Sequence, residues 1–113
     1  MINNQIHKNL DHSIGIFPTI KYSWKMYKYL VEFLGTTFFV YIILATGNPL
    51  AIGAALALVI LMASSISGGH MNPAVSIVMA SAGKISTAEL VPYILAQVFG
   101  GLVALEIYKR FKI

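Results

Sequence analysis

The hydrophobic positions of the chain gather in three long runs, and polar positions cluster at the ends of these runs. The runs cover residues about 29–46, about 50–66 and about 87–108. Each is close to the roughly 20 residues that a helix needs to cross a bilayer. A shorter run, residues 73–81, follows the polar stretch SISGGHMN. The pattern predicts an all-α, multi-pass integral membrane protein with three transmembrane helices.

The short run is predicted to be a helix that enters the membrane without crossing it. A helix over residues 73–81 would rise about 13 Å, less than half of a hydrocarbon core of roughly 30 Å. The two glycines before it end the second long helix, and Pro73 suits the first turn of a new helix with Asn72 as N-cap. We therefore expect a re-entrant half-helix. Residues 67–72 should line a water-filled cavity, because backbone groups at this depth need protein or water as partners.

Composition and charge support a membrane location. Hydrophobic residues make up 58% of the chain and charged residues 11%, against roughly 45–50% and about 25% in soluble domains. The net charge of +4 lies mostly beside the apolar runs, a pattern typical of lipid headgroup contact and not of a nucleic-acid surface. The flanking basic residues are Lys21, Lys25, Lys28, Lys109, Arg110 and Lys112.

These patterns divide the chain into three parts. Residues 1–27 are predicted to be a polar tail and an interfacial segment, of which residues 1–20 are flexible. Residues 28–110 form the membrane domain, and residues 111–113 are a basic C-terminal end. No cysteine occurs, so no disulfide or thiolate site is predicted.

The residues around the short helix resemble a known family. The stretch SGGHMNPAVS, residues 67–76, is similar to the first Asn-Pro-Ala loop of the aquaporin, or major intrinsic protein, family. EFLGTT, beginning at Glu32, resembles the opening of that family's first helix. The family's third helix is similar to the segment of this chain that contains Tyr93, Ala96, Gln97 and Gly100. The resemblance covers about residues 28–108 and implies a channel for water or small uncharged solutes.

One departure from the family affects the expected assembly. Family members contain two such halves in inverted orientation, which together enclose one pore, whereas this sequence carries one half. We expect the pore to form from two antiparallel copies within a higher homo-oligomer, or with another aquaporin-like half. The alternative is a non-conducting fragment or an accessory subunit that assembles with a full-length relative. We expect no enzyme, cofactor or metal site, because no nucleophile, paired carboxylate or phosphate loop is visible.

The candidate solute-path residues surround the start of the short helix. Asn72 is expected to cap that helix and also to bind solute through its amide donors. For His70 we expect a bond to the loop backbone, since no second metal ligand or carboxylate lies near it in sequence. The full set is Gly68, Gly69, His70, Met71, Asn72, Pro73 and Ala74.

Two polar residues in the long runs are expected to support the loop. Glu32 lies inside the first run, where an ionisable group is costly and needs a partner. The resemblance implies that Glu32 braces the backbone N–H groups of the loop. Gln97 either does the same or makes an ordinary bond between helices.

The resemblance also implies where the pore narrows. The constriction positions fall at Ile52, Ile60 and Val75, and Val75 stands where the family's second repeat has a selectivity arginine. An aliphatic rim is expected to admit a broader set of neutral solutes, such as glycerol or urea. Alternatively, a dry aliphatic constriction gates by dewetting.

Overall fold

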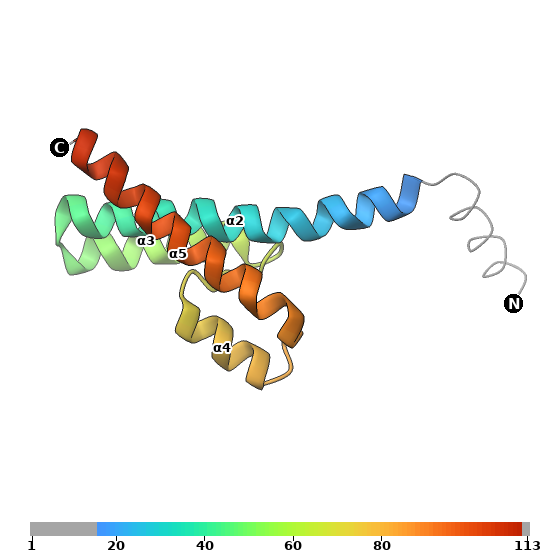
Figure 1. Cartoon of the computed structure of the whole chain (residues 1–113). Helices are drawn as coiled ribbons and strands as arrows, with labels where there is room; N and C mark the ends of the chain where they lie inside the picture. Colours follow the sequence, from blue (N-terminus) through green and yellow to red (C-terminus); the bar gives the residue numbers. More distant parts are fainter. Residues whose placement is uncertain (1–15, 112–113) are drawn as a thin grey trace, which may run out of the picture.

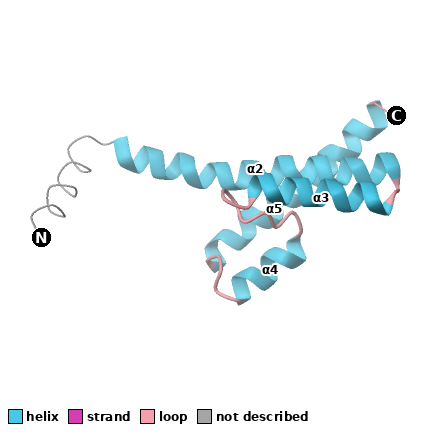
Figure 2. Cartoon of the chain, turned by 180° about the vertical axis from the view of Figure 1, so that it is seen from behind, coloured by secondary structure: helices cyan, strands magenta, loops and turns pink. Residues whose placement is uncertain are grey.

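The computed structural model describes residues 16–111, with side chains described from Met26 onward. Within these residues the chain forms four helices, α2 (Ile16–Thr46), α3 (Pro49–Ala63), α4 (Pro73–Ser81) and α5 (Thr87–Arg110), which are labelled in Figure 1. No strand occurs between residues 16 and 111, as Figure 2 shows. The predicted all-α class is therefore confirmed.

The first helix begins earlier than the hydrophobic pattern predicted. It starts at Ile16 and not near residue 29, so residues 16–20 of the predicted tail belong to the helix. The remaining tail residues, 1–15, lie outside the described part of the chain. No glycine occurs between residues 16 and 28, and Pro18 falls in the first turn, where a backbone N–H has no intrahelical partner in any case. The helix can therefore extend well beyond the apolar run.

The second helix ends earlier than predicted, at Ala63 instead of residue 66. The backbone N–H groups of Ile66 and Ser67 both donate to the carbonyl of Ala63, over 2.9 and 2.8 Å. The chain therefore tightens into a turn before it reaches the two glycines. This turn starts the loop that leads to α4.

A two-residue connection joins α2 and α3. The side chain of Asn48 accepts hydrogen bonds from the backbone N–H groups of Leu50 and Ala51, at 2.9 and 3.1 Å. Pro49 occupies the first turn of α3, where its missing N–H costs nothing. These local preferences turn the chain back, and α3 lies along α2 (Figure 1).

The long helix α2 is the scaffold of the fold. It packs on α5 and on α3, and α4 packs on α5, whereas no Cα atom of α3 lies within 8 Å of one in α5. The contact between α2 and α5 is close, since a Cβ on Gly100 would lie 2.6 Å from the carbonyl oxygen of Phe33. Thr37 adds a hydrogen bond to the carbonyl of Gly100, at 3.1 Å. Small residues thus let the two longest helices meet at backbone distance.

Two of the helices are long and apolar enough to cross a membrane. These candidate spans are Met26–Thr46 and Thr87–Arg110. The apolar helix α3 has 15 residues and is about 22 Å long at 1.5 Å per residue. Large hydrophobic side chains cover the outside of the helices, among them Leu61 at 77% exposure and Val91 at 62%. Such a surface is suited to lipid or to further helices.

Candidate functional site

The centre of the polar site is the carboxylate of Glu32, which is fully buried. Its Oε2 accepts hydrogen bonds from the hydroxyl of Ser67 at 2.7 Å and the backbone N–H of His70 at 3.0 Å. Its Oε1 accepts from the backbone N–H of Met71 and the amide of Gln97, both at 2.8 Å. A carboxylate offers about four acceptor positions, so donors from the loop and α5 fill all of them.

This hydrogen bonding explains how a charge is tolerated in the interior. A buried charge costs several kcal/mol unless it is well hydrogen-bonded, and four donors require the carboxylate without its proton. The loop reaches this geometry through positive φ angles, 66° at Gly69 and 56° at Met71. For Met71 that conformation costs about 1 kcal/mol, which its bond to Glu32 offsets. Glu32 on α2 therefore fixes the path of a loop that follows α3.

A second set of contacts holds the ring of His70. Its Nδ1 lies 2.8 Å from the hydroxyl oxygen of Ser76, so the ring bonds a side chain and not the loop backbone that the sequence led us to expect. The ring stacks on Tyr93, with centroids 4.9 Å apart and planes at 29°. The hydroxyl of Tyr93 donates to the carbonyl of Ser67 at 2.7 Å. The imidazole is thus fixed at its edge and at its face.

Asn72 starts α4 and stands exposed. Its side-chain oxygen accepts a hydrogen bond from the backbone N–H of Ala74, at 2.8 Å, and Pro73 follows as the first helical residue. The side-chain amide of Asn72 makes no hydrogen bond with the part of the chain that the structure describes. Its two N–H donors remain available to a ligand.

A polar pocket of about 820 Å³ opens between the loop and the start of α5. Of the predicted solute-path residues, Gly68 and His70 line this pocket. Lys28 and Glu89 form an ion pair at its edge, with the nitrogen and oxygen 3.8 Å apart. Other lining residues are Ser67, Met79, Lys84, Ser86 and Tyr93.

Two of the predicted path residues, Gly69 and Met71, pack against other helices and do not line this pocket. Gly69 is buried against α3, since a Cβ there would lie 3.2 Å from the Cα of Ile60. The side chain of Met71 packs below Gly35, where an added Cβ would lie 2.6 Å from its sulfur. Thr36 also directs its hydroxyl at that sulfur, over 3.7 Å. Because the N–H of Met71 bonds to Glu32, the backbone carbonyl is the group of this residue left to face a solute.

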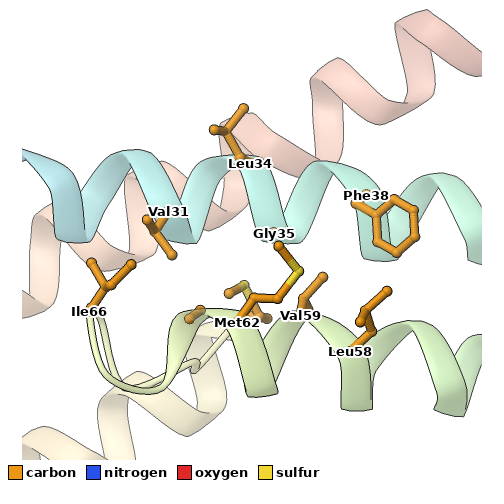
Figure 3. Close-up of a pocket in the computed structure, with 10 residues that line it drawn as sticks. Val31, Leu34, Gly35, Phe38, Leu58, Val59, Met62 and Ile66 are labelled. Carbon is orange, nitrogen blue, oxygen red and sulfur yellow. The ribbon is translucent and has the colours of Figure 1, made fainter.

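The side chain of Met71 belongs to an apolar groove between α2 and α3, shown in Figure 3. The groove has a volume of about 380 Å³. Its floor is the buried cluster of Val59, Ala63 and Met71. The side chains at its mouth include Val31, Leu34, Phe38, Leu58 and Met62. The side chains that line this groove pack α2 against α3 and offer no polar group to a solute.

Comparison with known proteins places the chain in a family. The family model described as major intrinsic protein matches residues 46–112. The chain belongs to the major intrinsic protein family. This finding confirms the resemblance seen in the sequence, and it makes the chain an integral membrane protein of a channel family and not an enzyme.

Individual relatives carry channel names. The chain is 42% identical over 95 residues to glycerol uptake facilitator protein-like 6 of Lactiplantibacillus plantarum, which covers 76% of the chain and 44% of that protein. It is 36% identical over 106 residues to aquaporin-8 of Notomys alexis, covering 84% and 41%. It is 43% identical over 58 residues to aquaporin Z of Photorhabdus laumondii, covering 51% and 25%. The chain spans less than half the length of these relatives, and no solved structure matches it.

The predicted constriction positions of this major intrinsic protein lie on two different helices. Ile52 and Ile60 lie on α3 and Val75 lies on α4, and no Cα atom of α3 is within 8 Å of one in α4. The constriction therefore stays a prediction about the assembled channel.

The sequence pointed to Glu32, Gln97 and the loop, but it missed the role of Ser76. This residue is fully buried and bonds both His70 and Gln97, each at 2.8 Å. Its position four residues after Asn72 places it one turn into the helix. That spacing was the available signal, and the partners themselves lie too far apart in sequence to be paired by pattern.

Proposed function

We propose that the chain forms a transmembrane channel for water and small uncharged solutes such as glycerol or urea. The observation that supports this most directly is the loop of residues 67–72, held by Glu32 so that Asn72 stands exposed at the start of α4. The free amide donors of Asn72 suit a solute that exchanges its bonds with water for bonds with protein. The names of the relatives agree with such a passenger.

The proposed membrane arrangement has three spans and one re-entrant half-helix within residues 28–110. The two long helices supply two spans, and α3 with its flanking turns supplies the third. The nine residues of α4 reach about 13 Å, too little to cross, so α4 enters and leaves on one side. The polar segment 1–27 and the basic end 111–113 lie outside the hydrocarbon core.

The proposed site favours neutral solutes. The first turn of α4 carries a partial positive charge, which disfavours cations. The amide donors of Asn72 add to this preference. Residues 67–72 contain no acidic side chain, and the carboxylate of Glu32 is already bonded to four donors, so a cation gains little there.

The proposed pore consists of two copies in antiparallel orientation within a larger homo-oligomer. One face of α3 is unpaired, because α2 is the one described helix on which α3 packs and a Cβ on Gly53 would meet no atom within 4 Å. Asn72 and Ala74 are also exposed in the single chain. Inverted halves that share a midplane site close such folds, and another aquaporin-like half offers the same geometry.

The test of conduction is water flux into proteoliposomes that contain the purified full chain. Wild-type protein is expected to raise permeability above the lipid background, and Asn72→Leu is expected to abolish that gain at equal abundance. Asn48→Leu is the matched control, because Asn48 caps a helix in the same way but lies in the exposed hairpin. Wild-type flux at the lipid background would overturn the channel and favour the accessory subunit.

A labelling experiment tests the antiparallel arrangement. The chain has no cysteine, so single cysteines can replace the exposed residues Leu50, in the first turn of α3, and Lys84, between α4 and α5. The proposed three-span arrangement puts these two positions on opposite sides of the membrane. An impermeant maleimide should label about half of each variant in sealed vesicles, because dual orientation exposes both ends. Complete labelling of one position with none of the other would contradict the antiparallel pore.

Solute range tests the proposed constriction of Ile52, Ile60 and Val75. With a relaxed aliphatic rim, glycerol and urea should cross along with water. High water flux without detectable glycerol or urea would contradict that rim. If nothing crosses until Ile52 or Ile60 is made smaller or polar, the constriction is a dewetted gate.

A further inference from the structure

We propose that Ser76 is a positioning residue that holds the imidazole of His70 as the Nε2–H tautomer, so that the ring offers a hydrogen-bond donor to the polar pocket. The contacts behind this proposal are the distances of 2.8 Å from the Ser76 hydroxyl to His70 Nδ1 and to Gln97 Nε2. The donors and acceptors of this buried cluster can be paired in one way.

The first step is the orientation of the amide of Gln97. Its Nε2 lies 2.8 Å from Glu32 Oε1 and 2.8 Å from Ser76 Oγ. The reverse orientation would place the amide oxygen against a carboxylate oxygen, where two acceptors repel each other. The nitrogen therefore faces Glu32, and its second N–H donates to Ser76.

The second step is the direction of the Ser76 hydroxyl. A hydroxyl has one donor and two acceptor positions, and the bond from Gln97 uses an acceptor position. Ser76 is fully buried, so its proton needs an acceptor within the protein. Ser81 on the same helix donates to the carbonyl of Ile77, but Ser76 makes no such bond within the described residues. The acceptor beside the Ser76 hydroxyl is His70 Nδ1.

The third step assigns the proton of the neutral ring. If Nδ1 carried it, Ser76 would receive two donors and keep a buried proton without an acceptor, at the full cost of desolvation. If Nδ1 is unprotonated, every donor in this chain of contacts has an acceptor. The proton of His70 then lies on Nε2.

The Nε2 atom of His70 faces the polar pocket. Among the described residues, Gln97 Oε1 is the buried side-chain atom that lacks a partner. His70 Nε2 also has no hydrogen-bond partner among these residues, but it is not fully buried, so it reaches the accessible surface. A Cβ on Gly68 would lie 3.1 Å from Nε2, and both residues line the polar pocket. The N–H is therefore presented beside Gly68.

A fixed donor at this position selects for a solute oxygen. An N–H binds the lone pairs of water, a hydroxyl or a carbonyl, whereas the other tautomer would present a lone pair and attract donors. Stacking on Tyr93 keeps the ring in its plane. The assignment of this donor to solute transfer depends on the proposed channel, whereas the tautomer itself does not.

Nitrogen-15 NMR of the full chain in lipid tests the tautomer. With His7 and His12 replaced by Gln, His70 is the single histidine. At a pH where the ring is neutral, Nε2 should show the shift of a protonated nitrogen and Nδ1 that of an unprotonated one. A protonated Nδ1 with an unprotonated Nε2 would overturn the proposal. This measurement needs no substitution at Ser76.

Variants at Ser76 test the positioning. Ser76→Ala should give a mixture of both tautomers, and Ser76→Thr, which keeps the hydroxyl, should restore the Nε2–H form. Ser81→Ala is the matched control in the same helix and should leave the spectrum unchanged. An unchanged tautomer in Ser76→Ala would show that Ser76 does not set it.

Flux measurements separate this inference from the proposed channel. Ser76→Ala should lower water permeability about two- to fivefold, the effect of losing one net hydrogen bond, and Ser76→Thr should recover it. Equal flux in Ser76→Ala with a mixed tautomer would overturn the solute contact. A wild-type chain that conducts nothing would overturn the channel alone, because the tautomer is read without flux.

Discussion

Two helices of this chain begin with the dipeptide Asn-Pro, and their surroundings differ. Asn48-Pro49 starts α3 in the exposed hairpin after α2, and Asn72-Pro73 starts α4 after the buried loop. Both asparagines accept backbone N–H bonds and both prolines occupy the first turn. The cap at Asn48 accepts two bonds and that at Asn72 accepts one. The start with the fuller cap is thus the one without a proposed function.

The difference between the two lies in the residues that precede them. A Cβ on Gly47 would meet nothing within 4 Å, whereas a Cβ on Gly69 would meet the backbone of α3 at Ile60. The N–H groups before Asn72 bond to Glu32. An Asn-Pro start therefore serves as a surface turn or as a candidate solute site, depending on what supports the approaching chain.

Removing the charge at Glu32 should break this support most strongly. Glu32→Gln leaves one acceptor oxygen for four donors, so at least two buried bonds are lost or reversed. We expect the free energy of unfolding to fall by about 3 kcal/mol, measured by denaturant titration in mixed micelles. Assembly and flux should fall with it.

The control for Glu32→Gln is Glu106→Gln. Glu106 is exposed and pairs with Lys109 over 3.6 Å, and such surface pairs contribute about 0–1 kcal/mol. Normal assembly and flux in Glu32→Gln would contradict the supporting role of the carboxylate.

Alanine at the two glycines sharpens the comparison at a smaller scale. Gly47 and Gly69 both have positive φ, 55° and 66°, which costs a residue with a side chain about 1–2 kcal/mol. Gly69→Ala adds a contact of 3.2 Å with the Cα of Ile60, a backbone atom that cannot easily move. We expect a loss of about 1 kcal/mol for Gly47→Ala and about 2–3 kcal/mol for Gly69→Ala, in the same titration. Equal losses would show that the loop is not confined by α3.

Removal of the caps should have the smallest effect on stability. Asn48→Ala should cost about 1 kcal/mol, and Asn72→Ala the same or less, because its side chain caps one N–H instead of two. Thermal unfolding followed by circular dichroism measures both. Water flux should instead fall more in Asn72→Ala than in Asn48→Ala. If Asn72→Ala is the more destabilised and conducts normally, Asn72 is a cap and not a solute ligand.

Much of this architecture can be predicted from local pattern. Asn72, Pro73 and the two glycines before them predict a short helix over residues 73–81, and α4 is observed as Pro73–Ser81. The start of α2 at Ile16 was missed because the residues before the apolar run are helical although they lack its apolar periodicity. The early end of α3 was missed because its last apolar residue, Ile66, lies in a turn and not in the helix.

By itself, the sequence determined the helical class, the membrane setting, the family and the two Asn-Pro helix starts, because these depend on composition, periodicity and neighbouring residues. Only the tertiary structure decided that Ser76, His70 and Gln97 form one cluster with Glu32, since these partners are 6 to 65 residues apart. It also decided that the side chain of Met71 faces the apolar groove while its N–H faces the carboxylate. Close packing and the pairing of every buried donor set these choices, and neither has a local signature.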